Sequence, residues 1–307
     1  MIEVLVPGPL TSVQDAFGRP GWRHMGVPVG GAADAWSARL ANRLVGNADD
    51  DALLEITLSG FAVRFDMTAS AAITGGMTAS AGGVPLAANA AFSVRTGSTV
   101  RVDRGWGVRG YLAIAGGIAV GPVLGSRATD LRSGFGGHHG RALKAGDRLE
   151  IGASTAMPTR WTGSRWDGPI RIVPGPHAPG VSLDGEWTVG PEADRTGVRL
   201  DGRRLAELGE VPSMGLPLGA IQVPPDGRPI VMLADRPVTG GYPVPACVIG
   251  ADIGRVAQLR PGDRVTFVSV SVEPAREALR QAEEELAALE PLEAPRDDEL
   301  GWVGSHE

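Results

Sequence analysis

The sequence of 307 residues contains a single cysteine, Cys247, and a single lysine, Lys144. One cysteine excludes an internal disulfide and a cysteine-rich metal site. With a single lysine, neither a Schiff-base lysine nor the phosphate-binding lysine of a P-loop can occur anywhere except at Lys144. The residues around Lys144 do not match a P-loop sequence. Cys247 lies in the apolar run 245–249, so we expect a small buried thiol there.

Several common catalytic signatures are also missing. The sequence has no G-x-S-x-G nucleophile elbow, no H-E-x-x-H zinc helix and no Ala-Met-Lys-Met string for covalent biotin. His138 and His139 lie in a glycine-rich stretch, residues 134–140, whose spacing does not match a dinucleotide-binding loop. Adjacent side chains usually point apart, so these two histidines would need further ligands from elsewhere to bind a metal. We interpret this stretch as a flexible loop. We predict no metal site and no covalent biotin.

Hydropathy and charge argue against membrane and nucleic-acid partners. The longest uncharged run, residues 67–94, consists mainly of Ala, Gly, Ser and Thr, so it is too weakly apolar to span a membrane. The first ten residues lack a basic region followed by an apolar stretch, and we therefore expect no signal peptide and a cytoplasmic protein. The formal net charge is −6, but residues 273–307 carry 11 acidic and 3 basic side chains, so the remainder is close to neutral.

Glycine and proline are abundant, with 45 and 24 residues. Helix interiors tolerate these two residues least, which favours a turn-rich β protein over a helical bundle. Val-Pro-Gly-Pro at 6–9 and 173–176 opens each half of the chain, and Gly-Asp-Arg at 146–148 and 262–264 closes it, as a duplicated β unit would. We predict domains at 1–155 and 170–272, a linker at 156–169, and a helix with an acidic tail at 273–307.

Capping residues and hydrophobic periodicity predict few helices. Asp34 is expected to cap a helix that Gly46 ends, and Asp252 to cap a second helix over 253–259. A third helix begins near Pro274, because apolar residues recur at three- and four-residue steps as far as Leu289. Short apolar runs bounded by turn residues predict strands at 111–115, 220–223 and 230–234.

Two clusters of polar residues are candidates for a binding site. In each, loop side chains could bind and orient a polar substrate, and adjacent glycines could present backbone N–H groups to an oxyanion. Asp235 could act as a base and Arg236 could pair with a carboxylate. Turn capping, a type II turn and ordinary ion pairs explain the same residues equally well. The first cluster is Thr11, Ser12, Gln14, Asp15, Arg19, Arg23 and His24; the second is Gln222, Asp235, Arg236, Thr239, Gly240, Gly241 and Tyr242.

A set of short motifs occurs in order along nearly the whole chain. They are PGPLTSVQD at 7–15, Gly18-Arg19, GVP at 26–28, LANRLVGN at 40–47, LEIT at 54–57, AGG at 115–117, GSR at 125–127, QVPPDG at 222–227 and TGGYP at 239–243. In these motifs the chain resembles the family called allophanate hydrolase subunit 2, KipA, or the C subunit of the prokaryotic ATP-dependent 5-oxoprolinase. The same module forms part of the carboxyltransferase region of urea carboxylase.

The resemblance implies a mainly β fold, with two tandem cyclophilin-like β-barrel domains, few short helices and a C-terminal helix. It also implies a heteromeric complex, in which the C subunit works with a KipI-like B subunit (allophanate hydrolase subunit 1-like) and with an A subunit. The implied activity is ATP-dependent hydrolysis of 5-oxoproline to glutamate. We expect the complex to use ATP and the isolated chain to be inactive. Gly30-Gly31-Ala32-Ala33-Asp34 departs from the Ser-Gly-Ala-Met-Asp common in the family.

The implied chemistry sets requirements on the site. The lactam of 5-oxoproline is an unstrained amide, so its hydrolysis must be driven by phosphorylation of the amide oxygen. The site then needs a cation for the substrate carboxylate, donors for the developing oxyanion and a base for water. The predicted catalytic residues are Asp15 or Asp235 as base and Gln14 or Gln222 as donors; the predicted substrate-binding residues are Arg19, Arg127, Thr239, Gly240, Gly241 and Tyr242. Of these, Arg19 or Arg127 would bind the carboxylate, and the Gly240 and Gly241 amides would be further donors to the oxyanion.

Two other functions stay open on the sequence alone. One is a carboxyltransferase subunit of a urea-carboxylase or allophanate-hydrolase type of system, which receives a carboxyl group from biotin on a separate carrier. The other is a KipA-like regulator that neutralises an inhibitor of a histidine kinase. Neighbouring genes would distinguish these functions, because each requires a different partner.

Overall fold

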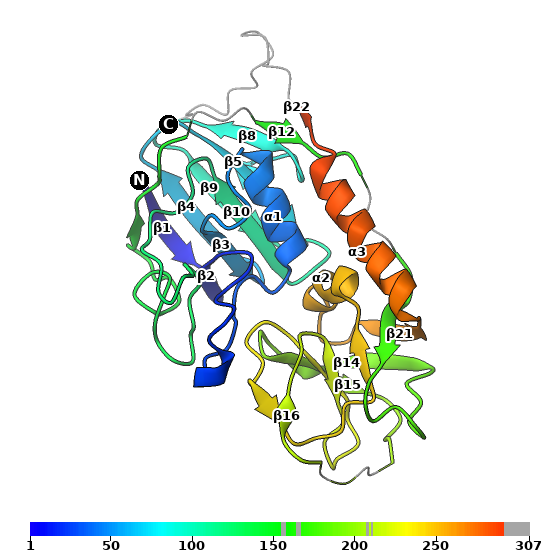
Figure 1. Ribbon diagram of the computed structural model, residues 1–307. Helices are drawn as coiled ribbons and strands as arrows, with labels where there is room; N and C mark the ends of the chain where they lie inside the picture. The colour runs from blue at the N-terminus through cyan, green and yellow to red at the C-terminus, as the bar shows by residue number, and fades with distance from the viewer. Residues whose placement is uncertain (155–157, 164–166, 207–208, 210, 292–307) are drawn as a thin grey trace. The chain divides into compact units, whose positions relative to one another are not determined.

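The computed structural model describes residues 1–154, 158–163, 167–206, 209 and 211–291, and the chain divides into two compact units (Figure 1). The first unit consists of residues 1–19, 34–163 and 285–307, and the second of residues 20–33 and 164–284. The predicted domain borders stay a prediction. The compact units differ from them in that 20–33 groups with the second unit and 285 onward with the first. The acidic tail beyond Pro291 and part of the predicted linker lie outside the described residues.

Two antiparallel sheets build the first unit. One has the strand order β11-β1-β4-β9-β6-β7 and the other the order β2-β3-β10-β5-β8. The strands are β1 (Ile2–Pro7), β2 (Leu10–Gln14), β3 (Leu53–Thr57), β4 (Phe61–Phe65), β5 (Ala69–Gly75), β6 (Thr78–Ala81), β7 (Val84–Pro85), β8 (Ala91–Val94), β9 (Thr99–Asp103), β10 (Arg109–Ile114) and β11 (Arg148–Leu149).

One hydrophobic core is shared by the two sheets of the first unit. Val4 and Val63 enter it from one sheet, and Val13, Leu54 and Leu112 enter it from the other. Successive side chains of a strand point to opposite faces, so the residues between these apolar positions face away from the core. The expected mainly β fold is confirmed, and in this unit its strands form two sheets around one core.

Helix α1 (Ala35–Leu44) confirms the first predicted helix. Asp34 accepts hydrogen bonds from the Ser37 amide at 3.1 Å and the Ser37 hydroxyl at 2.7 Å, which caps the N-terminus as expected. Gly46 follows the helix with a φ of +73°, the left-handed conformation that ends helices. Leu40 and Leu44 are buried where the helix packs against β5 and β10.

The chain's last described residues belong to the first unit. β12 (Thr159–Arg160) pairs with β22 (Glu290–Pro291), and the Arg43 guanidinium donates to the Leu286 carbonyl at 2.8 Å. These contacts tie residues 285–291 to segments that lie far earlier in the sequence.

The second unit contains a closed barrel with the strand order β13-β20-β17-β18-β15-β14-β21. Trp187, the largest fully buried side chain, lies in its core and donates to the Leu183 carbonyl at 2.9 Å. A separate pair, β16 with β19, lies in the same unit. The strands are β13 (Ile170–Pro174), β14 (Glu186–Ala193), β15 (Gly197–Asp201), β16 (Met214–Gly215), β17 (Ala220–Gln222), β18 (Ile230–Met232), β19 (Thr239–Gly240), β20 (Ala246–Val248) and β21 (Arg264–Ser269).

The two Gly-Asp-Arg turns are alike locally but join different strands. Asp147 accepts from the Lys144 amide, and Asp263 from the Arg260 amide, each at 2.7 Å. After the first turn β11 pairs antiparallel with β1, whereas after the second turn β21 pairs in parallel with β13. The repeated Gly-Asp-Arg sequence therefore indicates a shared turn geometry but not a shared strand topology.

The remaining helices are short, except for the last. η1 (Arg23–Met25) and η2 (Gly250–Asp252) are 3-10 turns, and α2 (Ile253–Ala257) and α3 (Val272–Ala287) match the second and third predicted helices. The predicted capping role of Asp252 is wrong. Its carboxylate makes no cap bond and instead accepts from Arg171, with the backbone N at 2.8 Å, Nε at 3.0 Å and Nη2 at 2.6 Å. No helix among the described residues is both long and apolar enough to cross a membrane.

Candidate functional site

A row of buried polar side chains crosses the five-stranded sheet of the first unit. The strand register places Ser12 of β2 opposite Glu55 of β3, Glu55 opposite Tyr111 of β10, and Tyr111 opposite Thr74 of β5. All four are at most 1% exposed. Their neighbours along each strand face the hydrophobic core, so this row occupies the opposite face of the sheet.

The start of α1 and a carboxylate hold the middle of this row. The Tyr111 hydroxyl donates to Glu55 Oε2 at 3.0 Å and accepts from the Asp34 amide at 2.8 Å, while the Thr74 hydroxyl donates to the Ser37 carbonyl at 2.6 Å. Burial, together with the charges of Glu55 and Asp34, raises the pKa of Tyr111 well above its ordinary value of 10. Tyr111 is therefore a fixed, protonated donor to Glu55.

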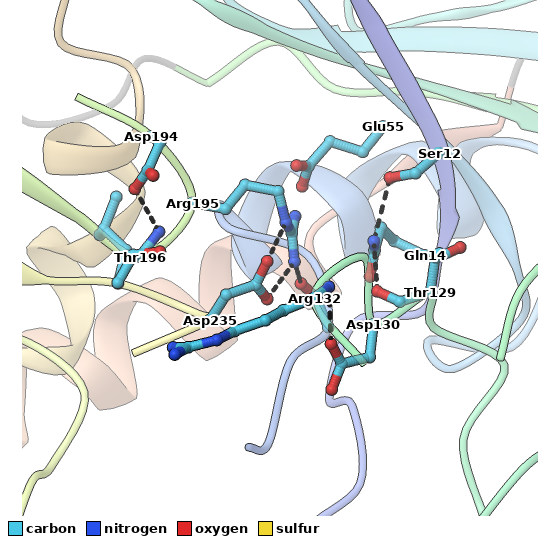
Figure 2. Close-up of polar contacts among 12 residues, drawn as sticks. Ser12, Gln14, Glu55, Thr129, Asp130, Arg132, Asp194, Arg195, Thr196 and Asp235 are labelled. Carbon is cyan, nitrogen blue, oxygen red and sulfur yellow. Dashed lines mark hydrogen bonds and ion pairs between the residues drawn. The ribbon is translucent and has the colours of Figure 1, made fainter. Parts of the chain in front are cut away.

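Gln14 ends the same face of β2 and presents an acceptor without a donor. Its Nε2 donates to the Ser12 hydroxyl at 3.0 Å and to the Thr129 carbonyl at 3.2 Å (Figure 2). A carbonyl can only accept, so the Thr129 contact fixes which end of the amide carries the nitrogen. The fully buried Oε1 then accepts no hydrogen bond within the described chain.

Asp130, the residue after Thr129, presents a second acceptor of this kind. Its Oδ1 accepts from the backbone amides of Arg132 at 3.1 Å and Ser133 at 2.9 Å, but its buried Oδ2 has no donor among the described residues. Buried polar atoms are costly when they stay unpaired. Gln14 Oε1 and Asp130 Oδ2 are therefore suited to a ligand or water that donates N–H or O–H groups.

Asp15 joins two of the predicted motifs. Its carboxylate accepts from the Gly18 amide at 2.6 Å, the Ser126 hydroxyl at 2.6 Å and the Arg127 amide at 2.7 Å. The side chain is 4% exposed. This geometry makes Asp15 a cross-link between the loop after β2 and the loop at 125–127, and its role as a base stays a prediction.

The two arginines predicted for the substrate carboxylate differ in their surroundings. Arg19 is buried, donates from Nη2 to the Ala128 carbonyl, and stacks its guanidinium over the Phe135 ring, 4.8 Å from the ring centroid. Arg127 is half-buried, and its guanidinium makes no hydrogen bond or ion pair with the described residues. Of the two, Arg127 has the guanidinium available for an anion.

In the second unit, Asp235 is paired with an arginine that the sequence did not suggest. Arg195 donates to its carboxylate at 2.8 and 2.9 Å (Figure 2). It also donates to the Gly31 carbonyl at 2.6 Å. Arg236, the sequence neighbour of Asp235, donates instead to the carbonyls of Leu216 at 3.0 Å and Leu233 at 3.3 Å. Asp235 is thus already neutralised within its own unit, and its role as a base stays a prediction.

The remaining predicted residues of the second unit lie together at β17 and β19. Gln222 is buried and donates from Nε2 to the Tyr242 carbonyl at 3.4 Å. A Cβ at Gly240 would lie 2.6 Å from Gln222 Nε2, so a larger residue there would require the Gln222 side chain to shift. Thr239 and Tyr242 are exposed, and the Gly241 carbonyl accepts from the Val211 amide at 3.0 Å. Their roles toward a substrate stay predictions.

Sequence reasoning did not single out Glu55, Tyr111 or Asp130 as site residues. Glu55 lies within the LEIT motif and Tyr111 within a predicted apolar strand. One usable signal was the single acidic residue inside the apolar run Leu53–Ile56. Cys247 differs slightly from expectation, since its thiol is half-buried and donates to the Leu218 carbonyl at 3.3 Å. The described residues contain no group of three or more His, Cys, Asp or Glu side chains placed to hold a metal ion.

Comparison with known proteins gives the same family from sequence and from structure. Residues 25–269 match the family described as carboxyltransferase domain, subdomain A and B. The chain is 38% identical to the C subunit of 5-oxoprolinase from Escherichia coli K12 over 91% of this chain and 94% of that protein. It is 35% identical to the urea amidolyase of Lachancea kluyveri over 95% of this chain but 18% of that protein.

A solved structure has a fold similar to that of this chain. The crystal structure of the Kluyveromyces lactis urea carboxylase superposes with a TM-score of 0.83 at 33% identity, over 97% of this chain and 30% of that one. The chain therefore spans less than a third of this enzyme, and the rest of the enzyme has no counterpart here.

Proposed function

The chain belongs to the carboxyltransferase domain family, subdomain A and B, and we propose that it acts there as the C subunit of an ATP-dependent 5-oxoprolinase, which hydrolyses 5-oxoproline to glutamate. The observation that carries this proposal is the extent of similarity to the E. coli C subunit, which covers nearly all of both chains. The urea amidolyase match leaves most of that enzyme without a counterpart. In the proposed complex the partners are a KipI-like B subunit and an A subunit.

We assign the use of ATP to the assembled complex and derive no phosphoryl-transfer step on this chain. A nucleotide phosphate site usually combines glycine-rich backbone with a lysine. The single lysine, Lys144, is exposed on a turn, and its backbone amide is already bound by the Asp147 carboxylate. These residues do not fit a phosphate cradle.

In this proposal, the first unit binds the amide part of the substrate. The lactam of 5-oxoproline carries one N–H donor, and Gln14 Oε1 and Asp130 Oδ2 are buried acceptors that need a donor. The Arg127 guanidinium, which has no partner among the described residues, is offered to the substrate carboxylate from a loop that Asp15 holds in place. Asp15 is then a positioning residue whose loss would displace Arg127.

A carboxyltransferase acting on urea is the second candidate, favoured by the superposition on urea carboxylase. Urea also donates N–H groups, so the same two acceptors would suit it. Urea is uncharged, however, and gives Arg127 no carboxylate to bind. Removing the Arg127 charge should therefore weaken recognition of 5-oxoproline under the first candidate and leave recognition of urea unchanged under the second.

Reconstitution tests the proposal. The chain is co-expressed with the adjacent B subunit, with and without the A subunit, and glutamate release from 5-oxoproline is measured with ATP. We expect ATP-dependent turnover from the complex and none from the isolated chain. Turnover by this chain alone would contradict its dependence on partners. A complex that leaves 5-oxoproline intact but carboxylates urea in the presence of a biotin carrier would contradict the 5-oxoprolinase assignment.

A further inference from the structure

Two guanidinium groups of the second unit meet at one backbone carbonyl. Arg23, at the start of η1, donates from Nη2 to the carbonyls of Leu216 at 2.8 Å and Val238 at 2.9 Å. Arg236 donates from Nε to the same Leu216 carbonyl at 3.0 Å. Leu216 and Val238 lie beside the β16–β19 pair, and the Leu216 amide donates to the Val238 carbonyl at 3.0 Å.

These two positive charges have no carboxylate partner among the described residues. Neither arginine makes a salt bridge there, and all the partners of their side chains are neutral backbone carbonyls. The acidic residue next in sequence, Asp235, is occupied by Arg195. Burying a charge is costly unless it is paired, and two like charges side by side raise that cost.

The nearby thiol does not supply the missing negative charge. Burial raises the pKa of Cys247 above its ordinary value of 9, with Arg236 as the opposing influence, so the thiol is neutral near pH 7. Burial and the charge of Arg23 lower the pKa of Arg236 to about 10, which still leaves the guanidinium charged at that pH. The pair therefore carries a net positive charge that is not balanced locally by the described residues.

Unused N–H groups, with one glycine beside Arg23, leave this pair able to bind a ligand. A guanidinium has five N–H groups, and the bonds described above use only some of them on each arginine. Gly215 lies beside Arg23, because a Cβ at Gly215 would come 3.7 Å from Arg23 Nη2. Thr239 and Tyr242, at the β19 end of this region, are exposed.

We propose that Arg23 and Arg236 form a binding site for the carboxylate of a small molecule. Paired guanidiniums match the planar geometry of a carboxylate, and one anionic charge would offset the repulsion between them. The site goes beyond the proposed function, because a carboxylate is recognised in this way whichever substrate the complex converts. It is also separate from the Arg127 loop, which belongs to the first unit.

Calorimetric titration of the full chain tests the site with defined probes: 5-oxoproline, L-glutamate, acetate and inorganic phosphate. The neutral lactam 2-pyrrolidinone, which lacks the carboxylate of 5-oxoproline, is the matched ligand control. We expect at least one carboxylate to bind and 2-pyrrolidinone not to bind. Binding of L-glutamate or acetate without 5-oxoproline would support the site, and the proposed substrate would still be decided by the reconstitution experiment. Absence of binding by every carboxylate, or tighter binding of phosphate, would overturn the proposal.

Variants then locate the binding. Arg23→Gln and Arg236→Gln should each weaken carboxylate binding by about tenfold or more. Arg264→Gln removes the same charge from an exposed position on β21 of the same barrel, where Arg264 pairs with Glu186, and should leave the affinity unchanged. Equal affinity in all three variants would refute the assignment.

Arg236→Lys separates recognition from folding. It keeps the charge but loses the planar fork, so it should bind the carboxylate with intermediate affinity. Thermal unfolding monitors each variant, because the arginines also bond to backbone carbonyls. If Arg236→Gln does not fold, Arg23→Gln and Arg236→Lys decide the outcome, and wild-type affinity in both would overturn the site.

Discussion

Arg195 binds Asp235 at two points, with Nε donating to Oδ2 at 2.8 Å and Nη2 donating to Oδ1 at 2.9 Å. Arg195 is almost fully buried, and its Nη2 also donates to the Gly31 carbonyl. The pair thereby fastens residues 20–33 to the barrel within the second unit. Asp235, which the sequence predicts as a base, is thus a structural anchor, so a test of the base prediction must be separated from the effect on stability.

Asp235→Asn should destabilise the chain. The change leaves the Arg195 charge without its carboxylate, and because the Asp235 side chain is 24% exposed, the cost should be about 1–3 kcal/mol, below that of a fully buried pair. Urea unfolding measures it. Asp226→Asn, which breaks an exposed pair with Arg199, should cost less than about 1 kcal/mol. Lost turnover at unchanged stability would instead support a base.

Asp15→Asn should loosen the loop that carries Arg127. Asparagine cannot accept all three hydrogen bonds, so we expect a loss of about 1–3 kcal/mol in the free energy of unfolding. Hydrogen exchange should accelerate at the amides of Gly18 and Arg127. Asp184→Asn, an exposed aspartate that bonds to Ser182, is the control and should change neither. Unchanged turnover in the assembled complex would refute Asp15 as base.

Gly136→Ala should be much more damaging than Gly125→Ala. Both glycines have positive φ, +72° and +81°, so each substitution costs about 1 kcal/mol of backbone strain. Only at Gly136 would the new Cβ meet atoms, the Ala128 carbonyl oxygen at 2.2 Å and Arg19 Nη2 at 2.8 Å. Thermal unfolding of the two variants checks this. Equal melting temperatures would mean that Ala128 and Arg19 move aside freely.

Asp147 should make the first unit sensitive to acid. Its hydrogen bonds from Arg141, opposed by desolvation, lower its pKa from 3.8 to about 2. Because the folded pKa is depressed, the stabilisation is complete above about pH 4 and is lost as the pH falls towards 2. The loss should be about 1–2 kcal/mol. Urea unfolding between pH 2 and 5 measures it. In Asp147→Asn that part of the pH dependence should disappear, whereas Asp263→Asn in the second turn should retain it.

Gln14→Met should impair turnover of the complex with little effect on folding. Methionine has a similar volume and removes an acceptor that has no donor among the residues that the structure describes, which offsets part of the loss of the two hydrogen bonds from Nε2. If the lactam N–H binds there, kcat/KM for 5-oxoproline should fall about tenfold or more. Gln281→Met on the exposed face of α3 should leave it unchanged. Equal kinetics in both variants would remove Gln14 from the site.

Local signals predicted local structure well. The cap at Asp34, the stop at Gly46 and the start of α3 near Pro274 were all readable, because each depends on residues a few positions apart. Asp252 shows the limit of this reasoning. It sits where a capping residue belongs, yet Arg171, 81 residues earlier, takes its carboxylate.

The candidate site could be predicted only in part from the sequence, because many of its contacts join residues that are far apart in the chain. Gln14 and Asp15 belong to a polar cluster that is visible in the sequence. The row that contains Ser12, in contrast, depends on strand register across the sheet, which aligns Glu55, Tyr111 and Thr74 from three other strands. Likewise, the proximity of Asp235 and Arg236 in the sequence does not identify the ion pair that Asp235 makes. Successive side chains point in different directions, and Arg195 on another segment reaches Asp235 instead.

The pairing of β12 with β22, together with the bond from Arg43 to Leu286, has a consequence for biosynthesis. A ribosome delivers the N-terminal segments first, yet the first unit acquires its last strand only after the whole second unit has been translated. The barrel must also wait, because β13 closes on β21 near its own end. Both units therefore depend on contacts of long sequence separation, which form slowly, and a chain truncated before residue 285 would leave the earliest-made unit incomplete.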